Sequence, residues 1–183
     1  MVPGRGDDVK RAITTFFKDP EPVSSIDDVE PGLNVVDGIA KVDEPLRSPV
    51  RGHNCIAYFY RSFLVMTGGR AGAPAIHKLK QAEVYAPFDL EMEGGVLPVV
   101  PSKPGSFSRE DHQDLAGQYG KGFQGVEEVI QPGARVRVRG KAKAAGGRLV
   151  LKMSDISVLE KRAVAAGVVG DRKERRKKRK RRK

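Results

Sequence analysis

Gln131-Pro-Gly-Ala-Arg-Val-Arg-Val-Arg-Gly-Lys-Ala-Lys-Ala-Ala-Gly-Gly-Arg-Leu-Val-Leu-Lys152 is the stretch that decides the fold. From Arg135 to Lys143, charged side chains alternate with apolar or small ones, and a period of two is typical of a half-buried strand. The run Ala-Ala-Gly-Gly at 144–147 supplies the permissive backbone of a reversal. The stretch therefore predicts one β-hairpin with an apolar face and a charged face.

The apolar faces of the two strands coincide if Lys143 lies opposite Arg148, which also places Val138 opposite Met153. The outward face then gathers seven cations: Arg135, Arg137, Arg139, Lys141, Lys143, Arg148 and Lys152. Like charges across a strand pair are destabilising. Either acidic side chains from elsewhere neutralise this face, or it serves to bind an anionic partner.

A second cationic element lies at the end of the chain. The sequence carries a formal net charge of +11. Residues 171–183 contain eleven Lys or Arg and two acids, which is +9, so residues 1–170 carry +2. The candidate anion-binding residues here are Arg172, Lys173, Arg175, Arg176, Lys177, Lys178, Arg179, Lys180, Arg181, Arg182 and Lys183. Since like charges repel, we expect a disordered polybasic tail that binds anionic lipid or nucleic acid.

The rest of the chain predicts a mainly β (α+β) fold, a partly open barrel or sandwich of about six to eight strands. Strands are expected near 33–42, 55–66, 77–85, 87–90 and 96–100, and short helices near 8–18, 108–119 and 154–166. We divide the chain into an N-terminal helix and acidic, Pro-rich linker at 1–30, one β domain at 31–166, and the tail at 167–183.

Composition excludes several kinds of site. A single cysteine, Cys55, cannot form an intrachain disulfide, a cysteine-rich zinc site or a RING. The three histidines are scattered, and no phosphate-binding loop or dinucleotide fingerprint is present. We therefore expect no metal, no cofactor and no small-molecule substrate. Cys55 and His53, two residues apart on one strand face, form the weak candidate for a nucleophile and base, and the alternative is a buried structural thiol.

Two further groups have a functional and a structural interpretation. Glu110, Asp111, His112 and Asp114 cluster in a polar insertion, where solvated loop polarity is the simpler explanation. Tyr58, Phe59, Tyr60 and Phe63 interleave with Arg61, which suits either a stacking platform for single-stranded nucleic acid or core packing.

No apolar run reaches the ~20 residues of a membrane span, and the N-terminus lacks the apolar core of a signal peptide. These features favour a cytoplasmic protein, with peripheral contact at a membrane as an open alternative.

Several short motifs follow one another in a recognisable order: Leu46-Arg-Ser-Pro49, Cys55-Ile-Ala-Tyr58, Pro87-Phe-Asp-Leu90, Gly125-Val-Glu-Glu-Val-Ile-Gln-Pro-Gly133 and the strand from Arg135 to Gly140. In this order they resemble the GIDE domain family, also called the "beside a membrane" (BAM) family, found in MULAN-type mitochondrial E3 ubiquitin ligases and their bacterial relatives. The similarity covers roughly residues 33–160.

The resemblance implies a β-rich recognition domain beside a membrane. In eukaryotic family members a RING follows the domain and carries the ligase activity, but this sequence contains neither a RING nor a transmembrane span. We expect a non-catalytic recognition or scaffold module, held by its polybasic tail at an anionic, membrane-like surface or on a protein partner. The alternatives are a nucleic-acid-binding β-barrel protein, which would use the 135–152 hairpin with the tail, and a ligase-like family member with no RING of its own.

Overall fold

Five strands close into a barrel in the computed structural model, which describes residues 20–66 and 74–159. They are β1 (Gly32–Lys41), β6 (Phe88–Met92), β7 (Gly95–Pro101), β9 (Arg135–Ala145) and β10 (Arg148–Val158). Around the barrel the order is β1-β6-β7-β10-β9, and only β7 and β10 run in parallel. Counted within the barrel, this order is first, second, third, fifth, fourth, the arrangement of a five-stranded OB-fold.

Gly38 allows β1 to lie close to β6 where β1 also pairs with β9. The strand pairs with β9 from Gly32 to Ile39 and with β6 from Ile39 to Lys41. A Cβ at Gly38 would lie 2.7 Å from the backbone oxygen of Glu91 and 2.7 Å from Leu90 Cγ. A side chain at this position would therefore push β1 and β6 apart where the barrel closes.

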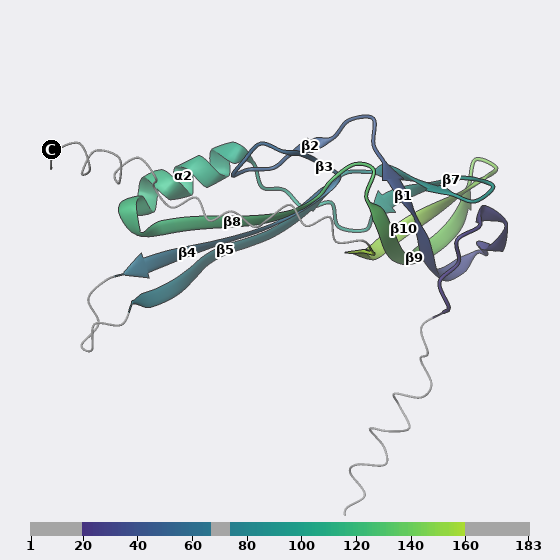
Figure 1. The fold of residues 1–183 in the computed structure, drawn as a ribbon, viewed down its shortest axis with the longest axis horizontal. Coiled ribbons are helices and arrows are strands. Elements are labelled where there is room, and N and C mark those ends of the chain that lie inside the picture. The colour runs from purple at the N-terminus through teal and green to yellow at the C-terminus, as the bar shows by residue number, and fades with distance from the viewer. Residues whose placement is uncertain (1–19, 67–73, 160–183) are drawn as a thin grey trace, which may run out of the picture.

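A second sheet projects from the barrel as an arm (Figure 1). Its strands are β5 (Ala75–Tyr85), β4 (Ala57–Met66) and β8 (Phe123–Ile130), in the order β5-β4-β8. The helix α2 (Arg109–Tyr119) packs on β8, and β2 (Leu46–Arg47) pairs with β3 (Asn54–Cys55) where the arm meets the barrel. Two short 3-10 turns, η1 (Ile26–Asp28) and η2 (Gly120–Gly122), complete the described elements.

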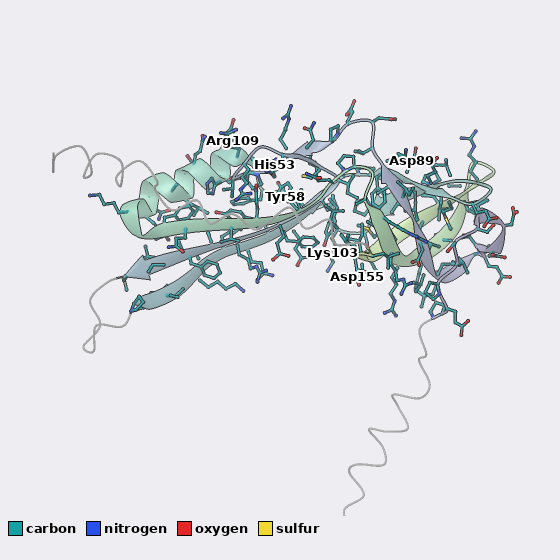
Figure 2. All side chains as sticks on the ribbon, viewed as in Figure 1. His53, Tyr58, Asp89, Lys103, Arg109 and Asp155 are labelled. Carbon is teal, nitrogen blue, oxygen red and sulfur yellow. The ribbon has the colours of Figure 1, made fainter. Side chains whose placement is uncertain are left out.

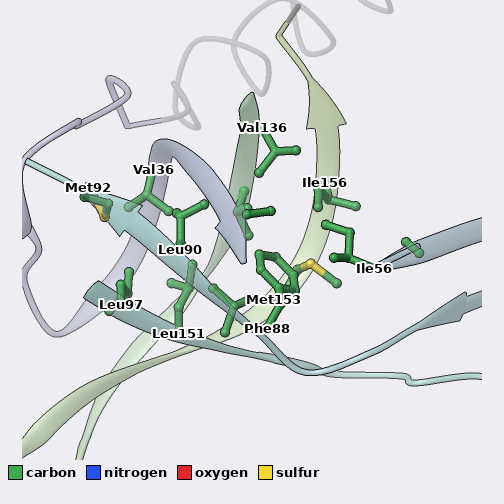
Figure 3. Packing of buried hydrophobic residues seen from close by; sticks show 14 of the residues in the cluster. Val36, Ile56, Phe88, Leu90, Met92, Leu97, Val136, Leu151, Met153 and Ile156 are labelled. Carbon is green, nitrogen blue, oxygen red and sulfur yellow. The ribbon is translucent and has the colours of Figure 1, made fainter. Parts of the chain in front are cut away.

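The barrel interior is aliphatic (Figure 3). Inward side chains of all five strands meet there, and Leu90, Leu97, Val136 and Leu151 have no exposed surface. Ile56, from the start of the arm, joins this cluster with its side chain, and its backbone bonds to Ile130 and Ala86 hold the base of the arm together. A smaller cluster beneath α2 contains Cys55, Tyr58, Tyr60, Val84 and Phe107.

The β-rich fold is confirmed, and so is the 135–152 hairpin, but its register differs from the prediction. Arg148 pairs with Ala145 and Val150 with Lys143, because Gly146 and Gly147, both with positive φ, make a two-residue turn. The shift is two residues, so every side chain keeps its predicted face. The extra strands of the fold form the arm, and the five-stranded barrel is closed rather than partly open.

The predicted helix at 154–166 is wrong over its described part, because β10 continues to Val158. The register shifts between Met153 and Asp155, so Ser154 forms a bulge in β10 and does not cap a helix. The helix expected in the polar insertion is confirmed as α2, with Ser108 as its N-cap. The helix expected at 8–18 and the tail at 167–183 lie outside the described residues.

Candidate functional site: a cationic row on the barrel

The predicted cationic face of β9 and β10 divides into two halves. In the first half acids are present. The guanidinium of Arg137 donates to both carboxylate oxygens of Asp37, at 2.8 Å each, and this pairing raises the pKa of Arg137. Arg139 lies opposite Asp155 on β10. Asp37 of β1 therefore neutralises Arg137, and β10 places a second acid, Asp155, opposite Arg139.

The second half has no such acids. Lys141, Lys143, Arg148 and Lys152 are exposed, and none of them has an ion pair with another residue in the described part of the chain. Lys141 and Lys152 are directly paired across β9 and β10. Side chains opposed in this way have Cβ atoms about 5 Å apart, so their charges repel each other. This repulsion is a cost that an anionic ligand would remove.

Exposed aliphatic residues flank the two lysines. Lys141 pairs with Leu33 of β1, and Lys152 pairs with Val100 of β7. Leu33 is 45% exposed and Val100 is 44% exposed. The four residues Leu33, Lys141, Lys152 and Val100 thus form one outward row across four strands, which we call the cationic row. It presents two adjacent positive charges between two apolar side chains.

The opposite side of the barrel has a different character. On β6 the outward residues are Asp89 and Glu91, and they pair with Pro98 and Val96 of β7. Figure 2 shows Asp89 of β6 and Asp155 of β10 on different sides of the barrel. Phe88 is the one aromatic residue in the five barrel strands, and it is buried at 5% exposure. The barrel strands therefore present no aromatic platform for stacking bases.

The arm contains a buried carboxylate that sequence reasoning missed. Glu127 of β8 is 7% exposed and accepts hydrogen bonds from the hydroxyl of Ser48 at 2.9 Å and from the backbone N–H groups of Val50 and Arg51 at 2.8 and 3.0 Å. Ser48 Oγ in turn accepts from the N–H of His53 at 2.9 Å. Glu127 thus holds the loop from Ser48 to His53 against the arm. The sequence signal for a buried carboxylate was the pair Glu127-Glu128 inside an otherwise apolar strand. Adjacent residues of a strand face opposite sides, so only one of these two carboxylates can face water.

Aromatic residues join α2 to the arm. The hydroxyl of Tyr58 donates to the backbone oxygen of Phe107, whose ring stacks on Tyr60 at 4.3 Å between centroids. Tyr60 Oη lies 3.0 Å from His112 Nδ1. Burial lowers the pKa of His112, as does Arg109, while Glu127 raises it. Tyr58 and Tyr60 are therefore core residues rather than a nucleic-acid platform, and Arg61 pairs with Glu128 at 2.8 Å.

Cys55 and His53, the weak candidates for a nucleophile and base, lie in surroundings that do not favour catalysis. Cys55 has no exposed surface, and burial, assisted by the nearby Glu127, raises its pKa to about 12. Its thiol contacts the backbone oxygen of Leu46 at 3.7 Å. A thiol with this pKa is protonated at neutral pH and is a poor nucleophile. The Nε2 atom of His53 is buried without a hydrogen-bond partner among the described residues.

The four polar residues of the insertion, Glu110, Asp111, His112 and Asp114, all lie on α2 but have different surroundings. Asp111 completes a capping box with Ser108, and the hydrogen bonds of this box lower its pKa. His112 faces the aromatic residues, whereas Glu110 and Asp114 are exposed. Among residues 20–66 and 74–159, no group of His, Cys, Asp and Glu is arranged to hold a metal ion. Within the same residues, no helix has the length and apolar character needed to cross a bilayer.

The tail cations, Arg172 to Lys183, lie outside the described residues, so the structure places only the hairpin half of the predicted anion-binding set. No protein-family model, curated protein or solved structure matches the chain. The resemblance to the GIDE family therefore stays a prediction.

Proposed function

We propose that the protein is a non-catalytic recognition module that docks on an anionic membrane surface through the cationic row. One observation carries the proposal: Lys141 and Lys152 are opposed in register, lack an ion pair within the described residues, and lie between exposed Leu33 and Val100. Lipid headgroups supply the phosphates that the lysines need. The acyl boundary beneath the headgroups accepts the two aliphatic side chains.

The polybasic tail strengthens the same interaction. Each Lys or Arg near an anionic leaflet contributes about 1 kcal/mol of attraction, which salt weakens. A tail of charge +9 therefore supplies long-range attraction, while the cationic row sets which face of the barrel meets the lipid. This division of roles fits the resemblance to domains that lie beside membranes.

Nucleic acid is the competing partner, and two observations weigh against it. OB-folds bind oligonucleotides on the face of their second and third strands. Here those strands are β6 and β7, whose outward residues include Asp89 and Glu91, and these would repel phosphates. The barrel strands also lack an exposed aromatic residue. Nucleic acid would be held by phosphate contacts alone.

The test is co-sedimentation of the full chain with phosphatidylserine-containing and neutral phosphatidylcholine liposomes over a salt series. We expect K141E/K152E to weaken binding to anionic liposomes about tenfold or more, since about 1 kcal/mol is lost for each lysine and reversal adds repulsion. The matched control is K80E/K121E, which makes the same charge change at exposed sites on β5 and η2. Equal weakening by both variants would contradict the proposal.

The aliphatic residues of the row distinguish lipid from nucleic acid. L33S/V100S keeps every charge, so it should weaken liposome binding and leave binding to single-stranded DNA unchanged. If DNA displaces the wild-type chain from liposomes and L33S/V100S still binds liposomes fully, the nucleic-acid function replaces the one proposed.

A further inference from the structure

A groove lies on the acidic side of the barrel and meets the cationic row at Val100, which lines it. It has a volume of about 580 Å³ and runs between the segment that follows β1 and the outward face of β6 and β7. Val42, Pro87 and Pro98 form apolar walls, and Asp43, Glu44 and Asp89 add three carboxylates. Lys41 also lines the groove, but its ammonium group pairs with Glu91 at 3.2 Å.

The one cation that lines the groove does not neutralise these carboxylates: Lys41 lies opposite Asp89 in the register of β1 and β6, but its ammonium group pairs with Glu91. Asp43, Glu44 and Asp89 are exposed, and none of them has an ion pair with another residue in the described part of the chain. A groove with apolar walls and unpaired carboxylates suits a Lys- or Arg-rich segment. The long aliphatic stems of such side chains cover apolar surface while their charged ends reach the carboxylates.

The register of the barrel brings the end of the described chain close to this groove. Leu159 donates its N–H to the backbone oxygen of Arg135 at 2.9 Å, and Arg135 pairs with Ile39 of β1. Two residues along, Lys41 pairs with Asp89 of β6. The path from β10 over β9 and β1 to β6 is three strand spacings, about 15 Å.

The remaining chain has the length and charge to fill the groove. Residues 160–170 precede the basic run, and an extended segment of this size spans about 35 Å, more than twice the distance. The basic run at 171–183 carries +9. Because it is tethered to the barrel, its effective concentration at the groove is in the millimolar range, which permits occupancy at modest intrinsic affinity.

We propose that this groove binds residues 171–183 of the same chain. In the free protein the basic run lies along β6, with its cations on Asp43, Glu44 and Asp89. An anionic surface competes for the same cations and draws the run out of the groove. Binding of the run in the groove requires only the charges of the groove and of the run, whether or not the cationic row is a membrane site.

Zero-length carbodiimide cross-linking of the full chain at low salt tests this contact, because it joins only carboxylates and amines that touch. Peptide mapping of the monomeric product should find the lysines of 173–183 joined to Asp43, Glu44 or Asp89, about tenfold more often than to the exposed acids Glu110 and Asp114 of α2. Links distributed equally over the groove and α2 would overturn the proposal.

Tryptic cleavage of the tail in the full chain supplies a second test. We expect D43N/E44Q/D89N to lose the 171–183 run about tenfold faster than wild type at low salt, because the free run is open to the protease. E30Q/E110Q/D114N, with the same loss of charge outside the groove, should cleave at the wild-type rate. Half-molar NaCl should raise the cleavage rate of the wild-type chain to that of the groove variant. Equal rates for wild type and the groove variant at low salt would also overturn the proposal.

Discussion

The barrel and the arm are held together by different physical means. In the barrel, five strands close on themselves, so no strand edge is left, and the interior is filled by aliphatic side chains. In the arm, three strands form an open sheet, and one face is organised by the Glu127 carboxylate and by the contacts among Tyr60, Phe107 and His112. Burial of apolar surface stabilises the barrel, whereas hydrogen bonds to polar groups specify the shape of the arm.

The difference also separates stability from recognition. A closed barrel with a tightly packed interior draws most of its stability from buried side chains, so its outward side chains can carry charge for recognition. Here the barrel surface carries both the cationic row and the acidic groove, which meet at Val100 of β7. The arm uses the buried carboxylate of Glu127 internally, where it holds the loop from Ser48 to His53.

The largest expected effect is in the barrel. Leu90 has no exposed surface, so L90A should lower the free energy of unfolding by about 3 kcal/mol through lost burial and a cavity. Urea denaturation measures this change. V96A, on the neighbouring strand with 53% exposure, should change it by less than about 0.5 kcal/mol. A small effect of L90A would mean that the barrel core is not the main source of stability.

An intermediate effect is expected in the arm. E127Q leaves one of the Ser48, Val50 and Arg51 donors without an acceptor and should cost about 2 kcal/mol. Hydrogen exchange should accelerate at the amides of Val50 and Arg51 while the barrel amides keep their protection. The neighbouring change E128Q removes only an exposed ion pair with Arg61 and should cost less than about 0.5 kcal/mol. Accelerated exchange throughout the barrel in E127Q would show that the two regions unfold as one unit.

The smallest expected effect depends on pH. Because the pKa of His112 is lowered below its ordinary 6.5, the unfolded chain binds the proton more readily than the folded one. The contribution of neutral His112 is complete above about pH 6.5 and is lost as pH falls through the folded-state pKa. Thermal unfolding between pH 8 and pH 5 should therefore show a steeper loss of stability in wild type than in H112Q. Parallel curves would contradict the assignment.

The sequence predicted what depends on local alternation. The period of two from Arg135 to Lys143 correctly assigned each side chain of β9 to a face, and Ser108 correctly marked the start of α2. The hairpin register was missed because four residues, Ala144 to Gly147, all permit a turn, and only Gly146 and Gly147 make it. The helix expected from Ser154 was wrong because a capping residue and a bulge residue look alike in sequence.

What the sequence did not predict comes from distant pairing. Asp37 lies 100 residues from Arg137, so its neutralising contact follows only from the pairing of β1 with β9. The cationic row has the same origin, because Leu33 and Val100 join Lys141 and Lys152 only once four strands are in register. The arm was not distinguished from the barrel, since a strand such as Ala57–Met66, apolar on both faces, fits the centre of either sheet.

The chain leaves the barrel twice to build the arm. The strands β4 and β5 are inserted between β1 and β6, whereas their partner β8 is inserted between β7 and β9. Neither excursion can be excised or grafted onto another barrel by itself, because removing residues 42–87 would leave β8 without its only strand partner among the described residues. An engineer who wants a minimal barrel must therefore cut and rejoin the gene at two places.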